Sequence, residues 1–314
     1  MSETAQEFFL GVKEKTEPKN WLFTADGQPR GYIDAIGLRE LWFHTGTNCN
    51  LACPFCLEGS KPGDRRLEFL SLEDVRPYMD AAVHLGVERF AFTGGEPFVN
   101  PSMLSILDYA LEHKPCLVLT NGTKPLHRRL KQLAAFRNKP HRVMFRVSLD
   151  YPDAARHDAG RGQGQFELAL DGLVKLQNLG FDVSVARLRS EGEDPAAVDD
   201  QFRDLFRRYG LPETVPIVSF PDFLPPYSAG NAPAITEDCM RRYTTPQQRR
   251  RFMCAYLRMV LKKNGRVRVY ACTLVDDDEA FDLGDNLAEA VRTRVRLKHH
   301  RCFACFKYGA SCSG

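Results

Sequence analysis

From residue 41 onward, short apolar blocks alternate with longer segments in which apolar residues recur every three or four positions. The short blocks are typical of buried strands, and the longer segments are typical of amphipathic helices. Strands are predicted at Leu41–Thr45, Arg89–Thr93, Cys116–Thr120, Val143–Leu149, Val183–Arg187 and Val215–Phe220. Helices are predicted from Ser71, from Pro101, and near residues 125–135, 165–179 and 195–209.

Six strand–helix repeats indicate an α/β fold built on a parallel sheet. Because the crossover between parallel strands is right-handed, the sheet is expected to curl into an open barrel related to the TIM fold. In such a barrel the functional loops follow the carboxyl ends of the strands. The loops after the predicted strands are therefore the places to search for a site.

The pattern divides the chain into three parts. Residues 1–40 have no strong periodicity and are predicted to form an N-terminal extension, residues 41–221 the barrel, and residues 222–314 a linker and a small Cys-rich domain. A run rich in proline and aromatic residues, 220–227, marks the boundary after the barrel. In the last part, the dipeptide Asn264-Gly265 lies between two apolar runs and predicts a β-hairpin.

Composition and charge exclude some classes of partner. The 314 residues are 43% hydrophobic, enough for a large core, and 43 Lys and Arg against 40 Asp and Glu give a formal charge of only +3. This balance provides no general attraction to nucleic acid or to an anionic membrane. The acidic run 276–279 is predicted to be a solvated loop. With no signal peptide and no stretch long enough to span a bilayer, the chain is expected to be cytoplasmic.

The densest chemistry is a cysteine triplet directly after the first predicted strand. Cys49, Cys53 and Cys56 follow the spacing Cys-x3-Cys-x2-Cys, and the chain has ten cysteines. In a reducing compartment, clustered thiols are better interpreted as metal ligands than as disulfides. Three ligands on a four-iron cluster would leave one iron open for chemistry. The alternatives are a zinc knuckle or a redox disulfide, but no second ligand pair follows nearby.

Residues at the ends of later strands are candidates for ligand binding. Gly94-Gly95-Glu96 follows the second strand, where paired glycines let a ligand approach the backbone closely. Asn121 follows the third strand. On the fourth strand, period two places Arg146, Ser148 and Asp150 on one face, so this polar face is expected to line the interior of the barrel.

The fifth strand carries a further candidate at its carboxyl end. Arg187 shares a face with Val183 and Val185. It is predicted either to pair with a ligand carboxylate through a two-pronged contact or to form a salt bridge at the rim of the barrel.

A second cysteine set lies in the last sixty residues. Cys254 and Cys272 flank the predicted hairpin, and Cys302 and Cys305 form a Cys-x2-Cys pair. Four thiols make a closed set that suits either zinc or a second [4Fe-4S] cluster, and spacing alone does not decide between them. Cys239 and Cys312 are left over.

The motifs together resemble the radical SAM superfamily. The loop matches the Cys-x3-Cys-x-aromatic-Cys motif of that family, with Phe55 in the aromatic place, and Gly94-Gly95-Glu96-Pro97 matches its Gly-Gly-Glu-Pro motif. The resemblance implies a partial (β/α)6 barrel in which Cys49, Cys53 and Cys56 hold a catalytic [4Fe-4S] cluster and S-adenosyl-L-methionine binds the open iron.

The same resemblance implies roles for individual cofactor-binding residues. Gly94, Gly95 and Glu96 would contact the methionyl amino group of S-adenosylmethionine. Ser148 and Asp150 resemble the ribose-binding pair, and Asn121 occupies a position near the cofactor.

The C-terminal cysteines resemble the Twitch and SPASM extensions of radical SAM enzymes, which hold auxiliary [4Fe-4S] clusters. This implies one auxiliary cluster on Cys254, Cys272, Cys302 and Cys305. There are departures: six residues separate Gly265 from Cys272 where the family has four, and only Cys312 remains after Cys305. The cysteines needed for two auxiliary clusters are therefore missing.

The implied activity is reductive cleavage of S-adenosylmethionine to a 5'-deoxyadenosyl radical, followed by hydrogen abstraction from a substrate. An external one-electron reductant of the flavodoxin or ferredoxin type is expected as partner. A two-electron oxidation of a small molecule is favoured, because 40 weakly patterned residues ahead of the barrel are too few for a leader-peptide module. A peptide-modifying maturase of the RiPP or sulfatase type and a non-catalytic iron-sulfur or zinc protein are the alternatives.

Overall fold

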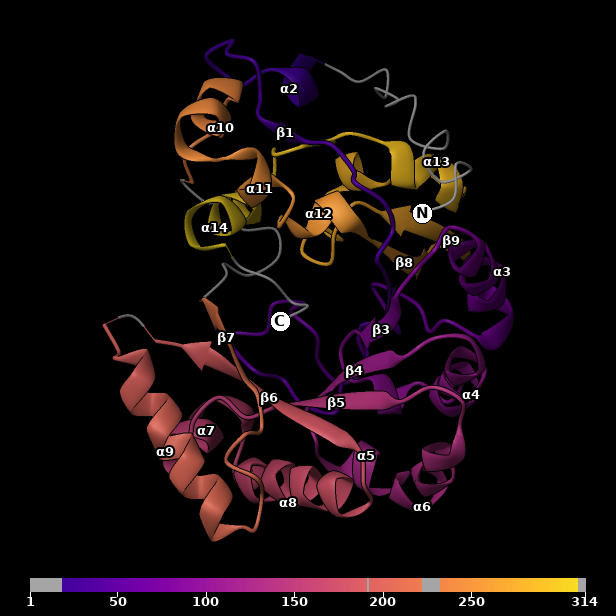
Figure 1. Cartoon of the computed structure of the whole chain (residues 1–314), viewed down its shortest axis with the longest axis vertical. Coiled ribbons are helices and arrows are strands. Elements are labelled where there is room, and N and C mark those ends of the chain that lie inside the picture. Colours follow the sequence, from indigo (N-terminus) through magenta and orange to yellow (C-terminus); the bar gives the residue numbers. More distant parts are fainter. Residues whose placement is uncertain (1–18, 191, 222–231, 310–314) are drawn as a thin grey trace.

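A computed structural model describes residues 19–190, 192–221 and 232–309 of the chain, and its main feature is one eight-stranded sheet (Figure 1). The strand order is β7-β6-β5-β4-β3-β2-β8-β9, and every neighbouring pair is parallel except β8 and β9. The strands are β2 Glu40–His44, β3 Arg89–Thr93, β4 Cys116–Thr120, β5 Val143–Ser148, β6 Asp182–Arg189, β7 Ile217–Pro221, β8 Leu257–Lys263 and β9 Arg266–Tyr270. The six predicted barrel strands are confirmed, each pairing with its sequence neighbour.

Helices connect the barrel strands as expected, with one exception. The main connections are α3 Leu72–His84, α4 Met103–His113, α7 Ala154–Arg161, α8 Gln165–Asn178 and α9 Pro195–Arg208. The single helix expected near residues 125–135 is instead three short pieces, α5 Lys124–His127, α6 Leu130–Leu133 and the 3-10 turn η2 Ala134–Asn138. The break follows α5, where the N–H of Arg129 bonds to the carbonyl of Leu126, three residues back. A bond of this kind tightens the last turn and ends the helix.

The remaining elements are short and lie mostly in the C-terminal part. They are α2 Lys19–Leu22, β1 Tyr32–Ile33, η1 Pro97–Val99, α10 Glu237–Tyr243, α11 Pro246–Arg249, α12 Met253–Tyr256, η3 Glu279–Phe281, α13 Leu287–Arg292, β10 Val295–Arg296 and α14 His300–Tyr308.

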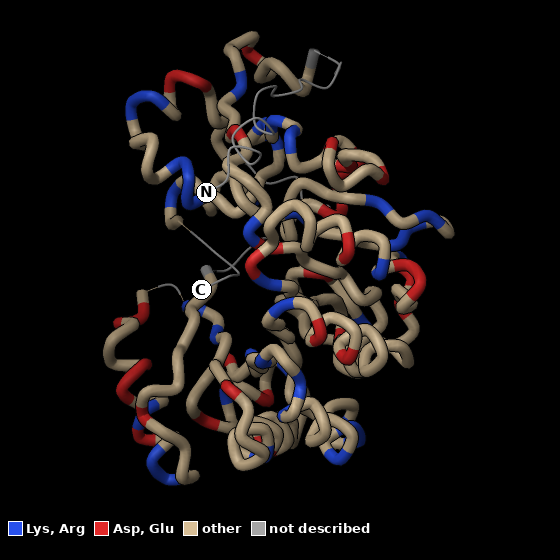
Figure 2. Tube along the Cα trace, turned by 45° about the vertical axis from the view of Figure 1, so that its right-hand side comes forward, with Lys and Arg blue, Asp and Glu red and all other residues tan. Residues whose placement is uncertain are grey.

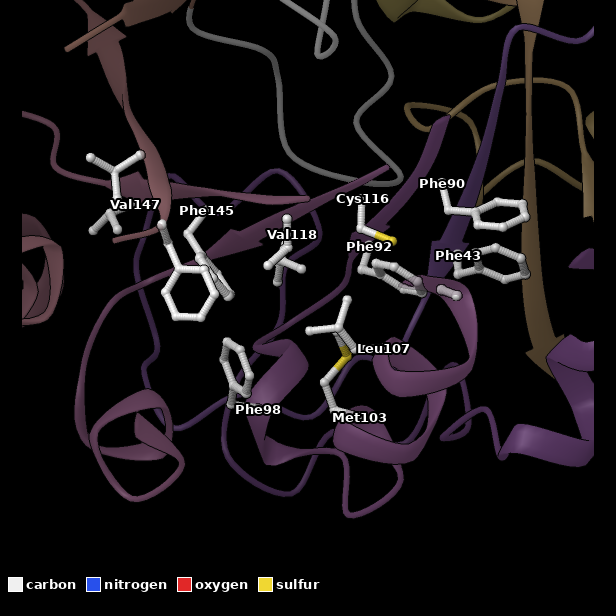
Figure 3. Close-up of a cluster of buried hydrophobic side chains, with 14 of the residues drawn as sticks. Phe43, Phe90, Phe92, Phe98, Met103, Leu107, Cys116, Val118, Phe145 and Val147 are labelled. Carbon is white, nitrogen blue, oxygen red and sulfur yellow. The ribbon is translucent and has the colours of Figure 1, made fainter. Parts of the chain in front are cut away.

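One face of the sheet packs against the helices and forms the larger core. Phe43 on β2 stacks on Phe92 of β3 at 5.5 Å and meets Phe90 edge-on at 6.0 Å (Figure 3). Phe145 and Val147 continue this face on β5 and are fully buried. Because side chains alternate along a strand, the residues between these positions face the inside of the barrel.

The predicted hairpin is confirmed, and it continues the barrel sheet. Asn264 and Gly265 both have positive φ, 52° and 72°, which suits the tight turn that joins two antiparallel strands. β8 also pairs in parallel with β2, in a register that sets Leu41 opposite Arg258. The boundary drawn at residue 222 remains a prediction, and the strands on either side of it share one sheet.

The described N-terminal residues pack against the C-terminal part of the chain (Figure 1). Trp21 is 3% exposed and meets Phe281 edge-on at 5.0 Å, and β1 pairs antiparallel with β10. Residues 19–40 thus contribute to the core of the C-terminal part. Residues 1–18, most of the Pro-rich boundary segment, and Cys312 lie outside the described residues.

The surface carries both signs of charge. Lys and Arg are interspersed with Asp and Glu along the chain (Figure 2). Across the described ranges, no helix combines the length and the apolar character that crossing a bilayer requires.

Replacing Trp21 with Ala tests the docking of the N-terminal segment. We expect the free energy of unfolding to fall by about 3 to 5 kcal/mol, because a large buried side chain is removed and a cavity remains. Phe23, on the same segment but 40% exposed, supplies the control substitution Phe23→Ala, which should change little. Urea unfolding monitored by circular dichroism gives both values, and equal effects would show that Trp21 does not anchor the segment.

Candidate active site

The loops that follow the barrel strands enclose one cavity. It brings together the three cysteines of the first motif and most of the strand-end residues. Among the lining residues are Cys49, Cys53, Phe55, Cys56, Gly94, Gly95, Asn121, Ser148, Asp150, Arg161 and Arg187. A site predicted from five separate stretches of sequence is therefore contiguous in space.

The cysteine loop is shaped by its own backbone bonds. The N–H of Cys56 donates to the carbonyl of Cys53 at 3.1 Å, and the N–H of Gly59 donates to Cys56 at 3.0 Å. Cys49 Sγ lies 3.4 Å from the N–H of Leu51 and 3.9 Å from Asn121 Nδ2. Amide donors aimed at a sulfur stabilise its anionic, metal-bound form.

The three thiols fit an iron-sulfur cluster. All of them are free. Burial raises the pKa of the Cys49 thiol to about 12 and raises the pKa of Cys53 and Cys56 as well. A thiol of this kind stays protonated at neutral pH unless a metal displaces the proton. The loop thus gathers three soft ligands that are inert without metal.

The glycine pair packs directly against the cysteine loop. A Cβ on Gly95 would lie 2.5 Å from the carbonyl oxygen of Asn48, and Gly94 has a φ of 140°, a conformation that favours glycine. The N–H of Gly95 donates to the carbonyl of Gly46 at 2.9 Å. The motif therefore lets the β3 loop approach the cysteine loop closely, while both glycines still line the cavity.

Glu96 is buried between the loops that follow β3 and β4. Its carboxylate accepts hydrogen bonds from the hydroxyl of Thr120 at 2.9 Å, the N–H of Asn121 at 2.7 Å and the N–H of Phe98 at 3.1 Å. It is 1% exposed and is not among the residues that line the cavity, and burial raises its pKa to about 7. The direct contact with the cofactor predicted for Glu96 stays an untested prediction. The side chain joins the end of β3 to the end of β4.

Of the three polar residues predicted to share the inward face of β5, two line the cavity, whereas Arg146 is 3% exposed, is not among the lining residues and donates from Nε to the hydroxyl of Ser184 at 3.2 Å. Ser148 and Asp150 line the cavity, and Asp150 is 4% exposed. Both oxygens of Asp150 accept from Arg161, one of them from Nη2 at 3.0 Å. The N–H of Asp150 donates to Nδ1 of His157 at 3.2 Å, which fixes the backbone before the helix α7.

Arg161 is a site residue that sequence reasoning missed. It is the last residue of α7, and its guanidinium lies over the ring of Phe55 at 5.6 Å. Its charge interacts with Cys53 and Cys56. Gly160 makes room for this contact, because a Cβ there would lie 2.2 Å from the Phe55 ring. The signal in the sequence was only a Gly-Arg pair at a helix end, with no periodicity to mark it.

Arg187 is among the residues that line the cavity, but its guanidinium is held on the α9 side. Its Nε donates to Asp199 at 3.1 Å and its Nη1 to Glu193, so two carboxylates on the α9 side hold the guanidinium. The reason is the period of the strand: Val183 and Val185, on the same face, pack in the helix-side core. Of the two roles predicted for Arg187, the salt bridge matches this geometry, while a contact with a ligand carboxylate stays an untested prediction.

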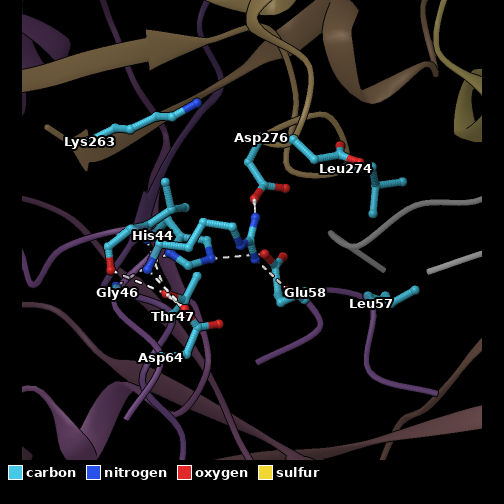
Figure 4. A network of polar contacts seen from close by, with 12 residues as sticks. His44, Gly46, Thr47, Leu57, Glu58, Asp64, Lys263, Leu274 and Asp276 are labelled. Carbon is cyan, nitrogen blue, oxygen red and sulfur yellow. Dashed lines mark hydrogen bonds and ion pairs between the residues drawn. The ribbon is translucent and has the colours of Figure 1, made fainter. Parts of the chain in front are cut away.

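A buried polar network lies behind the cysteine loop. Glu58 pairs with Nε2 of His44 at 3.0 Å, and Arg66 pairs with Asp276 at 3.0 Å and also donates to the carbonyl of Glu58 (Figure 4). Burial alone would raise the pKa of Glu58, but the charges of His44 and nearby arginines lower it, whereas burial raises the pKa of Asp276 to about 6.

This network corrects one prediction from the sequence. Asp276 is 2% exposed and the side chain of Asp277, which pairs with His299, is 3% exposed, so the expectation of a solvated acidic run at 276–279 was wrong for its first two residues. The burial of Asp276 follows from the ion pair with Arg66, which joins residues far apart in the chain.

The four C-terminal cysteines meet in a second cavity. Cys254, Cys272, Cys302 and Cys305 all line it. Burial raises the pKa of Cys254 and Cys272 and raises that of Cys302 to about 12. The convergence of four free thiols from α12, the end of β9 and α14 fits a closed metal site. Cys239 lies elsewhere, with its sulfur 3.2 Å from the hydroxyl of Thr236.

The two cavities are adjacent. Leu274 lines both of them. Arg301, next to Cys302, donates to the carbonyl of Leu274 at 3.2 Å and to the carbonyl of Leu57 at 2.7 Å. One buried guanidinium therefore ties the loop after Cys56 to the segment after Cys272.

Comparisons with known proteins place this architecture. Residues 43–189 match the family described as the radical SAM superfamily. The chain is 33% identical over 166 residues to the mycofactocin maturase MftC of Mycolicibacterium smegmatis, covering 52% of this chain and 40% of MftC. It is 32% identical over 139 residues to the GTP 3',8-cyclase of Cronobacter sakazakii, covering 43% of this chain and 41% of the cyclase. The chain thus spans about two fifths of the length of these relatives.

The fold is similar to that of a solved enzyme. Streptococcus suis SuiB bound to S-adenosylmethionine matches with a TM-score of 0.59 and 12% identity, covering 81% of this chain and 65% of SuiB. SuiB bound to its precursor peptide SuiA matches with a TM-score of 0.57. At this identity the similarity concerns the fold alone.

Stability should depend on pH through His157. Burial, together with the charge of Arg161, lowers the pKa of His157 from its usual 6.5 to about 4. Between these values the unfolded chain binds more protons than the folded one, so stability is lost as pH falls from about 6.5 to about 4. In His157→Asn, the loss of unfolding free energy between pH 6.5 and pH 4 should be smaller than in the wild type by up to about 3 kcal/mol.

The measurement is the free energy of urea unfolding at several pH values. His84, an exposed residue on α3, provides the control variant His84→Asn. A His157→Asn profile that runs parallel to that of the wild type would contradict the assignment.

Proposed function

We propose that the chain is a radical SAM enzyme that oxidises its substrate with the help of an auxiliary cluster, since residues 43–189 match the radical SAM superfamily. The carrying observation is that Cys49, Cys53 and Cys56 share one cavity with the strand-end residues Gly94, Gly95 and Asn121. A non-catalytic protein that kept only the fold would not need the cysteine loop and the strand-end residues to share one cavity.

In this proposal Cys49, Cys53 and Cys56 hold a [4Fe-4S] cluster. When bound there, the cluster and S-adenosylmethionine supply a 5'-deoxyadenosyl radical that abstracts hydrogen from the substrate. Phe55 and the glycine pair shape the cavity beside the cluster, and Ser148 and Asp150 bind the ribose. An external flavodoxin or ferredoxin supplies the electron.

We assign the cofactor carboxylate to Arg161. Two cations line the cavity, Arg161 and Arg187. Arg187 is engaged by two carboxylates on the α9 side, whereas Arg161 is paired through Nε and Nη2 with one carboxylate, Asp150, and its charge interacts with Cys53 and Cys56 beside the cluster site. A guanidinium also suits two-pronged recognition of a carboxylate.

The second cavity supports the oxidation step. Loss of a hydrogen atom leaves a substrate radical, and loss of a further electron and a proton completes a two-electron oxidation. An auxiliary [4Fe-4S] cluster on Cys254, Cys272, Cys302 and Cys305 would accept that electron. Leu274 lines both cavities, so the two sites are neighbours, which favours transfer between them.

For the substrate we favour a peptide, in contrast to the expectation from the sequence. SuiB has been solved with a precursor peptide over a fold that covers most of this chain, and MftC is named a maturase. A small-molecule substrate is the second candidate, since the GTP 3',8-cyclase matches at nearly the same identity.

The assignment of Arg161 predicts a difference between two matched variants. Lysine keeps the charge but loses the two-pronged geometry, so Arg161→Lys should weaken binding of S-adenosylmethionine about tenfold, or about 1.4 kcal/mol. Arg187→Lys should change affinity less than twofold. Calorimetric titration of the reconstituted protein under anaerobic conditions measures both. Loss of affinity in Arg187→Lys alone would return the carboxylate contact to Arg187.

Metal content tests the two-cluster assignment. Anaerobic reconstitution should give about eight iron atoms and about eight sulfides per chain. The double variant Cys302→Ala/Cys305→Ala should bind about half of this iron and sulfide. Cys239 lies outside both cavities, so Cys239→Ala should bind the full amount of both. Dithionite-driven formation of 5'-deoxyadenosine should persist in the double variant, since the first cluster is intact. Stoichiometric zinc on the C-terminal cysteines would refute the auxiliary cluster.

A further inference from the structure

Arg258 is a fully buried cation next to the four C-terminal thiols. It lies on β8, four residues after Cys254, and is 1% exposed. Its Nη1 donates to the carbonyl of Cys254 itself at 2.6 Å. Its charge interacts with Cys254 and Cys272.

All five N–H groups of this guanidinium are bonded to backbone carbonyls. Nη1 also donates to Leu257, Nε donates to Ala290 at 2.9 Å, and Nη2 donates to Val291 and to Thr293 at 3.1 Å. Its hydrogen bonding is therefore complete, but within the described parts of the chain no carboxylate forms an ion pair with it.

Two other arginines near the cavities, Arg187 and Arg161, differ in this respect. Arg187 is paired with Glu193 and Asp199, and Arg161 is paired with Asp150. Carbonyls at the end of α13 carry partial negative charge and offset part of the cost of burying Arg258. Partial charges do not equal a full anion, so a buried cation in this position calls for an anion nearby.

The four thiols supply that anion once they bind metal. A cluster held by four thiolates is negatively charged overall, and reduction adds one more negative charge. A fixed positive charge beside it stabilises the reduced form more than the oxidised form, which raises the reduction potential. Among other charged groups, Arg301 is buried and lines the same cavity, and its guanidinium donates to the carbonyls of Leu274 and Leu57 on the side of the first cavity. Arg30 and Asp278 interact with Cys302 with opposite signs, so their effects oppose each other.

We propose that Arg258 is the positioning residue that sets the reduction potential of the auxiliary cluster, by providing its buried counter-charge. The proposal rests on the proposed function in requiring a cluster on the four cysteines. A higher potential makes the cluster a better acceptor of the second electron.

The test compares three variants by redox titration followed with electron paramagnetic resonance. Arg258→Gln removes the charge, and Arg258→Lys keeps it with at most three donors. Arg268→Gln is the matched control, because Arg268 lies on the other strand of the same hairpin and its charge is already paired with Asp282.

Arg258→Gln is expected to disfavour reduction of the auxiliary cluster at least tenfold, a shift of about 59 mV to lower potential for a one-electron couple. In Arg258→Lys and Arg268→Gln the equilibrium constant for reduction of the auxiliary cluster should stay within threefold of the wild-type value. Arg258→Lys should nevertheless lower the urea midpoint of unfolding, since backbone carbonyls lose their hydrogen-bond donors. The signal of the first cluster should not change in any variant.

The outcomes separate the two claims. If Arg258→Gln fails to retain the auxiliary cluster, Arg258→Lys provides the test. A tenfold change in the equilibrium constant for reduction of the auxiliary cluster in Arg258→Lys, at full iron content, would show that Arg258 acts only through its hydrogen bonds. That result overturns the proposal. Equal potentials in wild type and Arg258→Gln, with both clusters loaded, overturn it while leaving the proposed function intact. Zinc in place of iron at the four cysteines overturns both.

Discussion

The parallel pairing of β8 with β2 is the interaction on which the arrangement of both cavities depends. β2 leads directly into the cysteine loop, and β8 follows Cys254 by three residues. The inward side chain of Trp42, on β2, lines the first cavity and packs in the same apolar cluster as Cys254 and Cys272. One shared strand pair thus holds the barrel and the second thiol set in a fixed relation, which local packing of a separate domain would not ensure.

Much of this could be read from the sequence, because the information was local. Strands β2 to β7 are visible in the sequence as apolar blocks. The dipeptide Asn264-Gly265 between apolar runs is typical of a β-hairpin turn. The close spacing of the cysteines favours a metal site. The alternation on β5 correctly placed Ser148 and Asp150 in the cavity. In each case neighbouring residues carried the whole signal.

What the sequence left open or missed depends on interactions between distant parts of the chain. For Arg187 two roles were left open, because only the packing of Val183 and Val185 against the helices shows which face of the strand it shares. Asp276 is buried because Arg66, more than two hundred residues earlier, pairs with it. The pairing of β8 with β2 likewise joins segments that no periodicity relates.

Leu274 has a further consequence if the proposed oxidation is correct. Because Leu274 lines both cavities, an electron would leave the substrate for a neighbouring site in the same chain, without waiting for a diffusing carrier. The lifetime of the carbon radical would then depend on the distance between the two cavities. A brief lifetime leaves little time for the radical to invert, to be quenched by a stray hydrogen donor or to attack the protein, so the stereochemical outcome of the reaction would depend on how the chain packs the second thiol set against the barrel.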